Sequence, residues 1–352
     1  MTPSSGTSLV NPIKASSLLK LEGEGYLDQH LTTSTPLSVR SRGFRTAGLD
    51  DRLAAIWSGG RVVGIGTADL KEEDVGQEKT LLTLHHIASA LLKHHTQSQF
   101  ANQPPLPLRA IPPGSPSPPT IYAVVPHTYQ TIPLLHALLA EKLSDSVAAL
   151  ELLKYVRLLQ YFDLAGLAES LAEVSEGIFR RIQSDKQSRD KTVRDIVLIQ
   201  GHQNAVSTIH RRSGLVQANA LLSSLVRNIT QISRMSRDVL VLVEAAVEPG
   251  LQAGEEARQD MTRSKRYLAG IELDSAFASL HGECLRLVCG SETLSRTLDV
   301  AFDTMVVVHD GFGRVIDEVR GHGKSERRIV EVVKDRLGDM TGSWGLWTFG
   351  SP

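Results

Sequence analysis

Short, predominantly apolar segments recur along this chain, and longer segments with helical periodicity lie between them. The clearest apolar segments are residues 120–126 (TIYAVVP), 195–200 (DIVLIQ) and 239–244 (VLVLVE). Strands with continuous hydrophobicity are buried on both faces, which is typical of a parallel sheet covered by helices. Right-handed crossovers between such strands make the sheet doubly wound. The pattern therefore predicts an α/β fold with a central, mostly parallel sheet.

The other elements follow from the same two periodicities. Further strands are expected at residues 61–65, 155–161, 303–309, 328–333 and 345–349. Helices are expected at residues 47–53, 80–95, 134–143, 164–182 and 218–235. Polar turns separate the last three strands, so we expect the sheet to close with C-terminal antiparallel strands.

Composition shifts suggest how the chain is organised. Residues 1–40 are rich in Ser, Thr and Pro, and we expect a flexible N-terminal arm there. Residues 41–350 are expected to form one core domain. Within that core, the Pro-rich segment 97–119 is expected to be a disordered loop, because little in it can pack. The charged segment 248–298 breaks the strand–helix rhythm and is expected to be a helical insertion.

Composition also excludes several classes of protein. The chain has 352 residues, 41% of them hydrophobic, and a net charge of −1, so it is not a uniformly basic nucleic-acid coat. Two cysteines exclude a disulfide framework. No apolar run reaches the ~18 residues of a membrane-spanning helix, and the N-terminus lacks a signal-peptide core. We therefore expect a cytosolic or nuclear protein without a membrane partner.

A remnant of a phosphate-binding loop follows the strand at residues 61–65. A P-loop has the pattern G-x-x-x-x-G-K-[S/T] between a strand and a helix. Here Lys79 and Thr80 precede an apolar helical run, but Glu73 and Glu78 stand at the two glycine positions. The alternative is that Lys79 and Thr80 simply begin a helix.

Three further motifs occur in an order that resembles the RecA-like recombinase core. They are residues 48–53 (GLDDRL) with the Gly-Gly pair at 59–60, residues 161–167 (YFDLAGL), and residues 328–336 (RIVEVVKDR) followed by 342–349 (GSWGLWTF). The order is similar to that of the eukaryotic recombinase paralogues. The resemblance implies a RecA-like P-loop NTPase fold over roughly residues 45–350.

The chain departs from that family at the nucleotide site. In the family, an Asp that positions magnesium follows the strand that corresponds to residues 196–199, and Gln200 stands there instead. A neutral amide is a poor ligand for magnesium, which prefers carboxylates. Lys79, Thr80 and Gln200 are therefore interpreted as a nucleotide-binding remnant, and we expect no catalytic residue and no cofactor. Weak binding of ATP and magnesium is the alternative.

The resemblance also points to DNA-binding and partner-binding residues. Arg211 and Arg212 fall where the family has its first DNA-binding loop. Further basic residues in the insertion, near the second such loop, are Arg263, Lys265 and Arg266. Phosphate contacts by these side chains would be sensitive to salt, and a solvated loop is the alternative.

Phe44 and Ala47 match the F-x-x-A motif by which these recombinases bind a neighbouring subunit. The motif lies closer to the next element than it does in the family. A local core role for Phe44 is therefore the alternative.

Other polar residues do not form a convincing site. His85, His86, His94 and His95 lack the i, i+4 spacing of a helical metal site, so we expect surface histidines and no metal. Cys284 and Cys289 have no second cysteine pair, and we expect buried free thiols. Trp344 and Trp347 are expected to pack on the sheet.

These expectations combine into one functional hypothesis. The resemblance implies a nuclear recombinase paralogue in homologous-recombination repair, which binds single-stranded DNA and assists recombinase filament assembly without hydrolysing ATP. Its expected partners are other recombinase paralogues and the RecA-like recombinase itself. The alternatives are an active DNA-dependent ATPase with an atypical P-loop, and an interaction scaffold without DNA binding.

Overall fold

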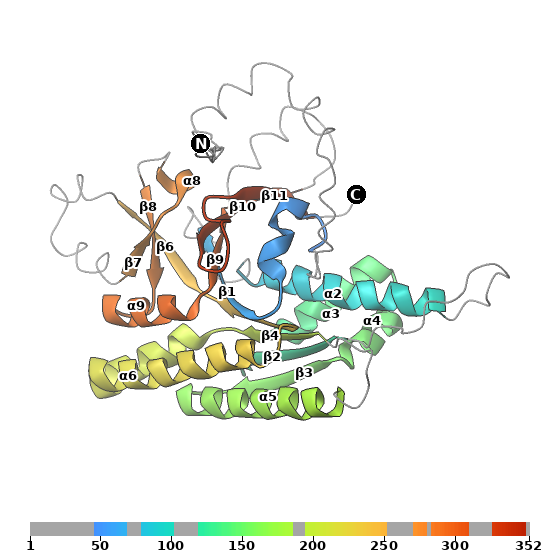
Figure 1. Cartoon of the computed structure of the whole chain (residues 1–352), viewed down its shortest axis with the longest axis horizontal. Helices are drawn as coiled ribbons and strands as arrows, with labels where there is room; N and C mark the ends of the chain where they lie inside the picture. The colour runs from blue at the N-terminus through green and yellow to red at the C-terminus, as the bar shows by residue number, and fades with distance from the viewer. Residues whose placement is uncertain are drawn as a thin grey trace, which may run out of the picture.

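The computed structural model describes residues 46–68, 79–101, 119–185, 194–251, 270–279, 283–309 and 326–349. These residues form an eight-stranded sheet, a separate three-stranded sheet and helices around both (Figure 1). The strands of the large sheet are β1 (Arg61–Ala68), β2 (Thr120–Pro126), β3 (Val156–Tyr161), β4 (Asp195–Ile199), β5 (Val239–Glu244), β9 (Thr304–His309), β10 (Glu326–Asp335) and β11 (Trp344–Phe349).

The strand order in this sheet is β11-β10-β9-β1-β5-β4-β2-β3. Every pairing from β9 through to β3 is parallel, and β10 pairs antiparallel with both β9 and β11. The expected α/β fold, with a mostly parallel sheet and closing antiparallel strands, is confirmed. This order also brings the carboxyl ends of β1, β5, β4 and β2 together at one edge of the sheet.

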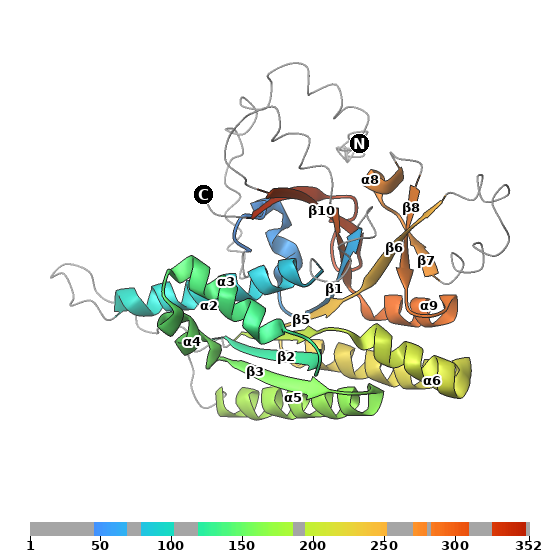
Figure 2. The same cartoon turned by 180° about the vertical axis from the view of Figure 1, so that it is seen from behind.

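Helices cover both faces of the sheet (Figure 2). One face packs against α2 (Lys79–Ala101), α3 (Thr131–Leu143) and α4 (Ser146–Leu153). The other packs against α5 (Leu164–Asp185), α6 (His202–Arg234) and α9 (Glu292–Ala301). Alternate residues of β4 enter the two cores: Ile196 and Leu198 face α2 and α3, whereas Val197 and Ile199 face α5 and α6. Burial on both faces explains the continuous hydrophobicity of this strand.

The segment 248–298, expected to be a helical insertion, contains strands as well as helices where the structure describes it, and α9 begins within it. It contains β6 (Ala246–Leu251), β7 (Gly270–Leu273) and β8 (Glu283–Val288), paired antiparallel in the order β6-β8-β7, and the short α8 (Ala276–Ser279). Leu285 and Leu287 are buried while Arg286 between them is half-buried. This period of two is typical of a strand, and the charge content of the segment concealed it.

Several boundaries differ from those expected. The first short element is a 3-10 helix, η3 (Asp51–Trp57), and the Asp50 carboxylate accepts a hydrogen bond from the Arg52 amide. Helix α6 begins at His202, well before residue 218, and is kinked at Gly214, whose φ is +82°. Helix α2 continues to Ala101, so the first residues of the expected 97–119 loop are helical. Helix α4 had no counterpart among the expected elements.

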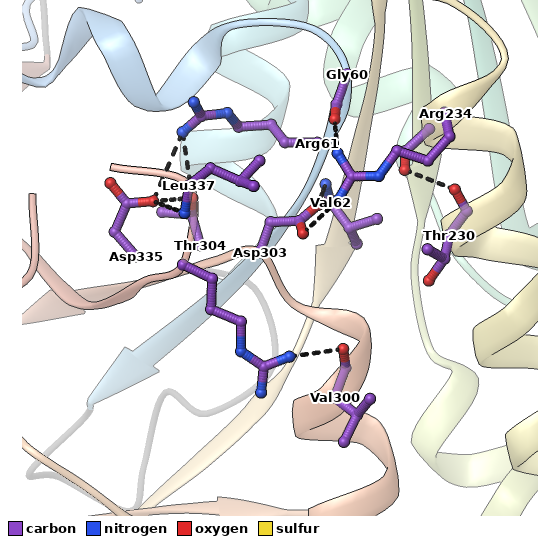
Figure 3. A network of polar contacts seen from close by, with 12 residues as sticks. Gly60, Arg61, Val62, Thr230, Arg234, Val300, Asp303, Thr304, Asp335 and Leu337 are labelled. Atoms are coloured by element: carbon purple, nitrogen blue, oxygen red, sulfur yellow. Dashed lines mark hydrogen bonds and ion pairs between the residues drawn. The ribbon is translucent and has the colours of Figure 1, made fainter. Parts of the chain in front are cut away.

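A polar network ties together the amino ends of β1 and β9 (Figure 3). The Asp303 carboxylate accepts hydrogen bonds from the Val62 amide at 2.8 Å and from the Arg234 guanidinium at 2.7 Å. Arg234 also donates to the Gly60 carbonyl, and Arg61 donates to Thr304 Oγ1 at 3.3 Å. The network fixes the central strands at the end opposite to the candidate site. Within the described ranges, no helix is long and apolar enough to span a bilayer.

Candidate functional site

Two polar residues end neighbouring strands in the middle of the large sheet. Gln200 directly follows β4, and Glu244 is the last residue of β5. Both side chains are buried, with exposed fractions of 0% and 7%. In open α/β sheets, ligands bind at the carboxyl ends of the strands, so this edge is where a nucleotide site would form.

Gln200 uses its side-chain amide and its backbone carbonyl in separate hydrogen bonds. Its Nε2 donates to Glu244 Oε1 at 2.7 Å, and its Oε1 accepts from Thr131 Oγ1 at 2.5 Å. Its carbonyl accepts from the Tyr161 hydroxyl. Gln200 therefore links β4 to β5, to α3 and to the end of β3.

Glu244 receives hydrogen bonds on both its side chain and its backbone. Besides Gln200, Thr83 Oγ1 donates to Glu244 Oε1 at 3.2 Å, from the second turn of α2. Gln203 Nε2, near the start of α6, donates to the Glu244 carbonyl at 2.8 Å. Burial and the nearby Glu244 charge raise the pKa of Tyr129, so its hydroxyl stays protonated. Gln200 and Thr83, the donors to the carboxylate oxygen Oε1, are both neutral, and Gln203 binds only the backbone carbonyl.

This arrangement limits what the site can do chemically. A magnesium site needs carboxylate oxygens that can turn toward the ion. At the end of β4 an amide occupies that place, and one oxygen of the carboxylate on β5 already accepts two hydrogen bonds. No group of three or more His, Cys, Asp or Glu in the described part of the chain could hold a metal ion. The geometry favours a closed polar cluster over a metal-dependent catalytic centre.

The backbone at Gly201 helps to shape this edge. Gly201 has a φ of +66° and precedes α6, and a Cβ there would lie 2.4 Å from Pro126 Cγ. A side chain at this position is therefore excluded by both backbone conformation and space. The next residue, His202, is 1% exposed, and within the described residues neither ring nitrogen has a hydrogen-bond partner. Burial lowers its pKa to about 4, so the imidazole is neutral at pH 7.

The Lys79–Thr80 remnant follows β1 in the chain and forms the first two residues of α2. This position fits both a P-loop remnant and the simple start of a helix, so it does not decide between the two interpretations. Glu73 and Glu78 fall outside the described residues, so the interpretation of this loop as a P-loop remnant stays a prediction. The α2 residue that does reach the cluster is Thr83.

Sequence reasoning identified Gln200 but missed Glu244, Thr83 and Thr131. A signal for Glu244 exists, because a lone carboxylate ends the apolar run VLVLVE. Such a residue follows a buried strand and comes to the edge where the other strands of a parallel sheet end. The two threonines carry no comparable signal, since each belongs to a helical segment that is rich in apolar residues.

Arg211 and Arg212 lie on helix α6 and not on a loop, which corrects the expected position. Both side chains are exposed, as are all residues from 211 to 217 around the kink at Gly214. A loop was expected because the resembling family has its first DNA-binding loop at this place, whereas residues 211–217 form an exposed part of a helix. The other expected DNA-binding residues, Arg263, Lys265 and Arg266, lie outside the described residues.

Ala47 belongs to a turn that is bonded to its own chain. Its side chain is exposed, and its backbone amide donates to Ser89 Oγ on α2 at 2.9 Å. The neighbouring Thr46 hydroxyl lies 2.9 Å from His86 Nδ1. Phe44 lies outside the described residues, so the proposed role of Phe44 and Ala47 in binding a neighbour stays a prediction.

The expectation of surface histidines is wrong for His85 and His86. His86 is fully buried and stacks on Trp57, with ring centroids 4.6 Å apart, and His85 packs edge-on against Trp347 at 5.2 Å. Helix α2 is buried continuously from residue 82 to 88, because the sheet, η3 and α3 surround it. Burial lowers the pKa of His85 to about 4 and that of His86 to about 3.

The remaining sequence expectations concern Cys and Trp. Cys284 and Cys289 are buried free thiols, as expected, and burial raises the pKa of Cys289 to about 12. Trp347 is fully buried on the sheet, whereas Trp344 is 38% exposed.

Comparisons with known proteins give little further guidance. No protein-family model matches the chain, and no curated protein matches it. Among solved structures, the chain is similar to the crystal structure of the RadB recombinase, with 13% identity, 82% of this chain and 87% of that chain covered, and a TM-score of 0.41. A likeness this weak carries no argument, so the site is judged on its own geometry.

Proposed function

We propose that this chain is a RecA-like subunit that works by binding other molecules and not by hydrolysing ATP. In this proposal it belongs to a complex of recombinase paralogues in the nucleus. There it binds single-stranded DNA and helps a RecA-like recombinase to assemble its filament during homologous-recombination repair. The strand order and the antiparallel closing strands agree with the architecture that the sequence resemblance implies.

One observation supports the proposal that the chain does not hydrolyse ATP. At the strand ends where the family positions magnesium, Gln200 donates to Glu244, and the cluster is completed by Thr83 and Thr131. Opening it for a metal ion would break these bonds and leave buried polar groups unpaired, at about 1 to 3 kcal/mol for each group. The neutral amide of Gln200 is too weak a ligand for magnesium to offset this loss.

Nucleotide binding by the purified full-length chain tests this proposal. Calorimetry with Mg²⁺-ATP should show no binding that depends on Lys79, and ATP turnover should stay at background with and without single-stranded DNA. The matched variant is Lys79→Ala, which should behave like the unchanged chain. Tight binding of Mg²⁺-ATP that is lost in Lys79→Ala would contradict the proposal.

The binding function rests on the exposed basic turn of α6 and on partner subunits. Arg211 and Arg212 are exposed together, and both can reach phosphate groups without rearranging the core. Co-purification with tagged RecA-like subunits tests the partner assignment, and fluorescence imaging of the tagged chain tests the nuclear location. If the chain binds neither single-stranded DNA at low salt nor any RecA-like subunit, the proposed role is wrong.

A second candidate function has one observation in its favour. Glu244 places a buried carboxylate one strand away from the expected magnesium position, beside the central strand β1. If this carboxylate turned to a metal ion, the chain would be a DNA-dependent ATPase with an atypical P-loop. DNA-stimulated turnover that is abolished by Glu244→Gln would establish this alternative. A scaffold without DNA binding remains the third candidate, and the same DNA-binding measurement separates it.

A further inference from the structure

Helix α5 and the turn that leads into it carry two exposed phenylalanines. Phe162, just before the helix, is 79% exposed, and Phe179, near its last turn, is 50% exposed. The inner face of the same helix is fully buried through Leu167, Leu171, Val174 and Ile178. In Figures 1 and 2, α5 forms the outer border of the molecule, and no described element covers it.

The surface between the two phenylalanines is smooth. Ala165, Ala168 and Ala172 are exposed and, with Phe179, fall within a stripe about 60° wide at 3.6 residues per turn. Small side chains let a second helix approach closely, because interaxial distance depends on the side chains at the contact. From Ala165 to Phe179 the stripe is about 21 Å long at 1.5 Å per residue, which matches roughly four turns of a partner helix.

The ring of Phe162 packs against His127 of the same chain. Its ring lies 4.3 Å from that of His127, which follows β2. The Asp163 carboxylate accepts a hydrogen bond from the Gly166 amide at 2.9 Å, and this bond fixes the turn that leads into α5. Phe162 is therefore held outward before any partner arrives.

Acidic residues line one side of the stripe. Glu169, Glu173 and Glu176 are exposed along that side, and the nearby Arg180 is already paired with Glu176. Complementary charge guides association and disfavours partners of the same sign. This face would therefore repel a nucleic acid and attract a basic polypeptide.

We propose that the outer face of α5 docks an amphipathic helix of a partner protein. That helix has an aliphatic seam that packs on Ala165, Ala168 and Ala172 between the two phenylalanines, and Lys or Arg on the flank that meets Glu169 and Glu173. When an amphipathic helix binds a partner surface, its apolar contact residues recur at i, i+3, i+4 and i+7. The inference does not depend on the proposed function, since it concerns a surface that does not include the Gln200–Glu244 cluster.

The test uses the full-length chain and two synthetic peptides of about 20 residues. The first peptide has a Leu/Ala seam at helical spacing with lysines beside it, and the second has glutamates in place of those lysines. Fluorescence anisotropy should show saturable binding of the lysine peptide, and the glutamate peptide should bind at least about tenfold more weakly, since 1.4 kcal/mol is a factor of ten.

Variants of exposed residues localise the binding. Phe162→Ala with Phe179→Ala, and separately Glu169→Lys with Glu173→Lys, should each weaken the lysine peptide at least about tenfold. Val147→Ala, at a 69% exposed position on α4, is the matched control and should leave the affinity unchanged. Because all these side chains are exposed, circular dichroism should show that each variant stays folded.

Four outcomes would overturn the inference. They are no binding of the lysine peptide, equal binding of both peptides, equal loss in Val147→Ala, and displacement of the peptide by a single-stranded oligonucleotide. The last outcome would assign this face to nucleic acid. None of these results depends on ATP binding or on Arg211 and Arg212, so the proposed function can fail or stand separately.

Discussion

Gln200 Nε2 donates a hydrogen bond to Glu244 Oε1 across 2.7 Å, between the ends of two adjacent parallel strands. The pair joins an amide, where the resembling family has a carboxylate, to a carboxylate on the next strand. Because an amide can donate and a carboxylate only accepts, the two side chains are complementary as they stand. The contribution of each side chain to stability therefore depends on which residue occupies the other position.

Exchanging these two groups should reveal that dependence. Gln200→Glu removes the donor and sets two buried carboxylates against each other, which should lower the free energy of unfolding by about 2 to 4 kcal/mol. Glu244→Gln keeps a donor and should cost about 1 kcal/mol. The double variant restores one donor and one carboxylate and should recover most of the loss. Urea denaturation of all four proteins measures the coupling, and additive losses would contradict it.

Arg211 and Arg212 should contribute to single-stranded DNA binding through phosphates. In Arg211→Ala with Arg212→Ala, affinity for an oligonucleotide should fall for every sequence, and the dependence of log K on log salt should become less steep by about 1 to 2 units. Arg296→Ala is the control, because Arg296 lies on α9 and pairs with Glu292. Fluorescence anisotropy at several salt concentrations measures both quantities. A salt dependence equal to that of the unchanged chain would show that these arginines are only solvated.

The buried histidines should make the fold sensitive to acid. Burial lowers the pKa values of His85 and His202 to about 4 and that of His86 to about 3, below the value near 6.5 of an unfolded chain. The unfolded chain therefore binds more protons, and stability should fall as the pH drops from about 6.5 toward 4. Each group adds up to about 1.4 kcal/mol per pH unit to this decline.

His202 offers the sharpest test of this pH dependence. His202→Leu loses no observed hydrogen bond, so it should stay folded at pH 7.5 and decline less steeply below pH 6.5. His136→Gln, at the surface of α3, is the comparison. Urea denaturation between pH 7.5 and 4.5 gives the slopes. Equal slopes for His202→Leu and the unchanged chain would mean that His202 does not carry the effect.

Asp303 should be among the costliest positions in the amino-end network. Asp303→Ala leaves the amide of the buried Val62 without its acceptor and frees the Arg234 guanidinium, so the loss should be about 2 to 4 kcal/mol. Glu292→Ala removes one partner of an exposed ion pair and should change stability by less than about 1 kcal/mol. Thermal and urea unfolding compare the two variants. Similar small losses in both would argue against the network.

The sequence alone was sufficient for most of the large sheet. Runs such as TIYAVVP and VLVLVE are apolar at nearly every position, which suits burial on both faces of a sheet, and their strand bounds were predicted to the residue. The charged segment after β5 was misjudged, because the short alternation of β7 and β8 is a weaker signal than a long apolar run. The first half of α6 was missed because its exposed turn at residues 211–217 interrupts the apolar period of the helix.

The sequence by itself determined the type and order of these elements. It also identified Gln200, at the end of one of them, as a departure from the resembling family. Only the tertiary structure decided which strand lies beside which, because hydrophobic periodicity carries no information on strand order. That order places Gln200 against Glu244, which lies 44 residues later in the chain, and brings Thr83 and Thr131 to the same cluster. Local sequence sets how each segment folds, whereas the pairing of distant polar groups depends on burial that the whole sheet creates.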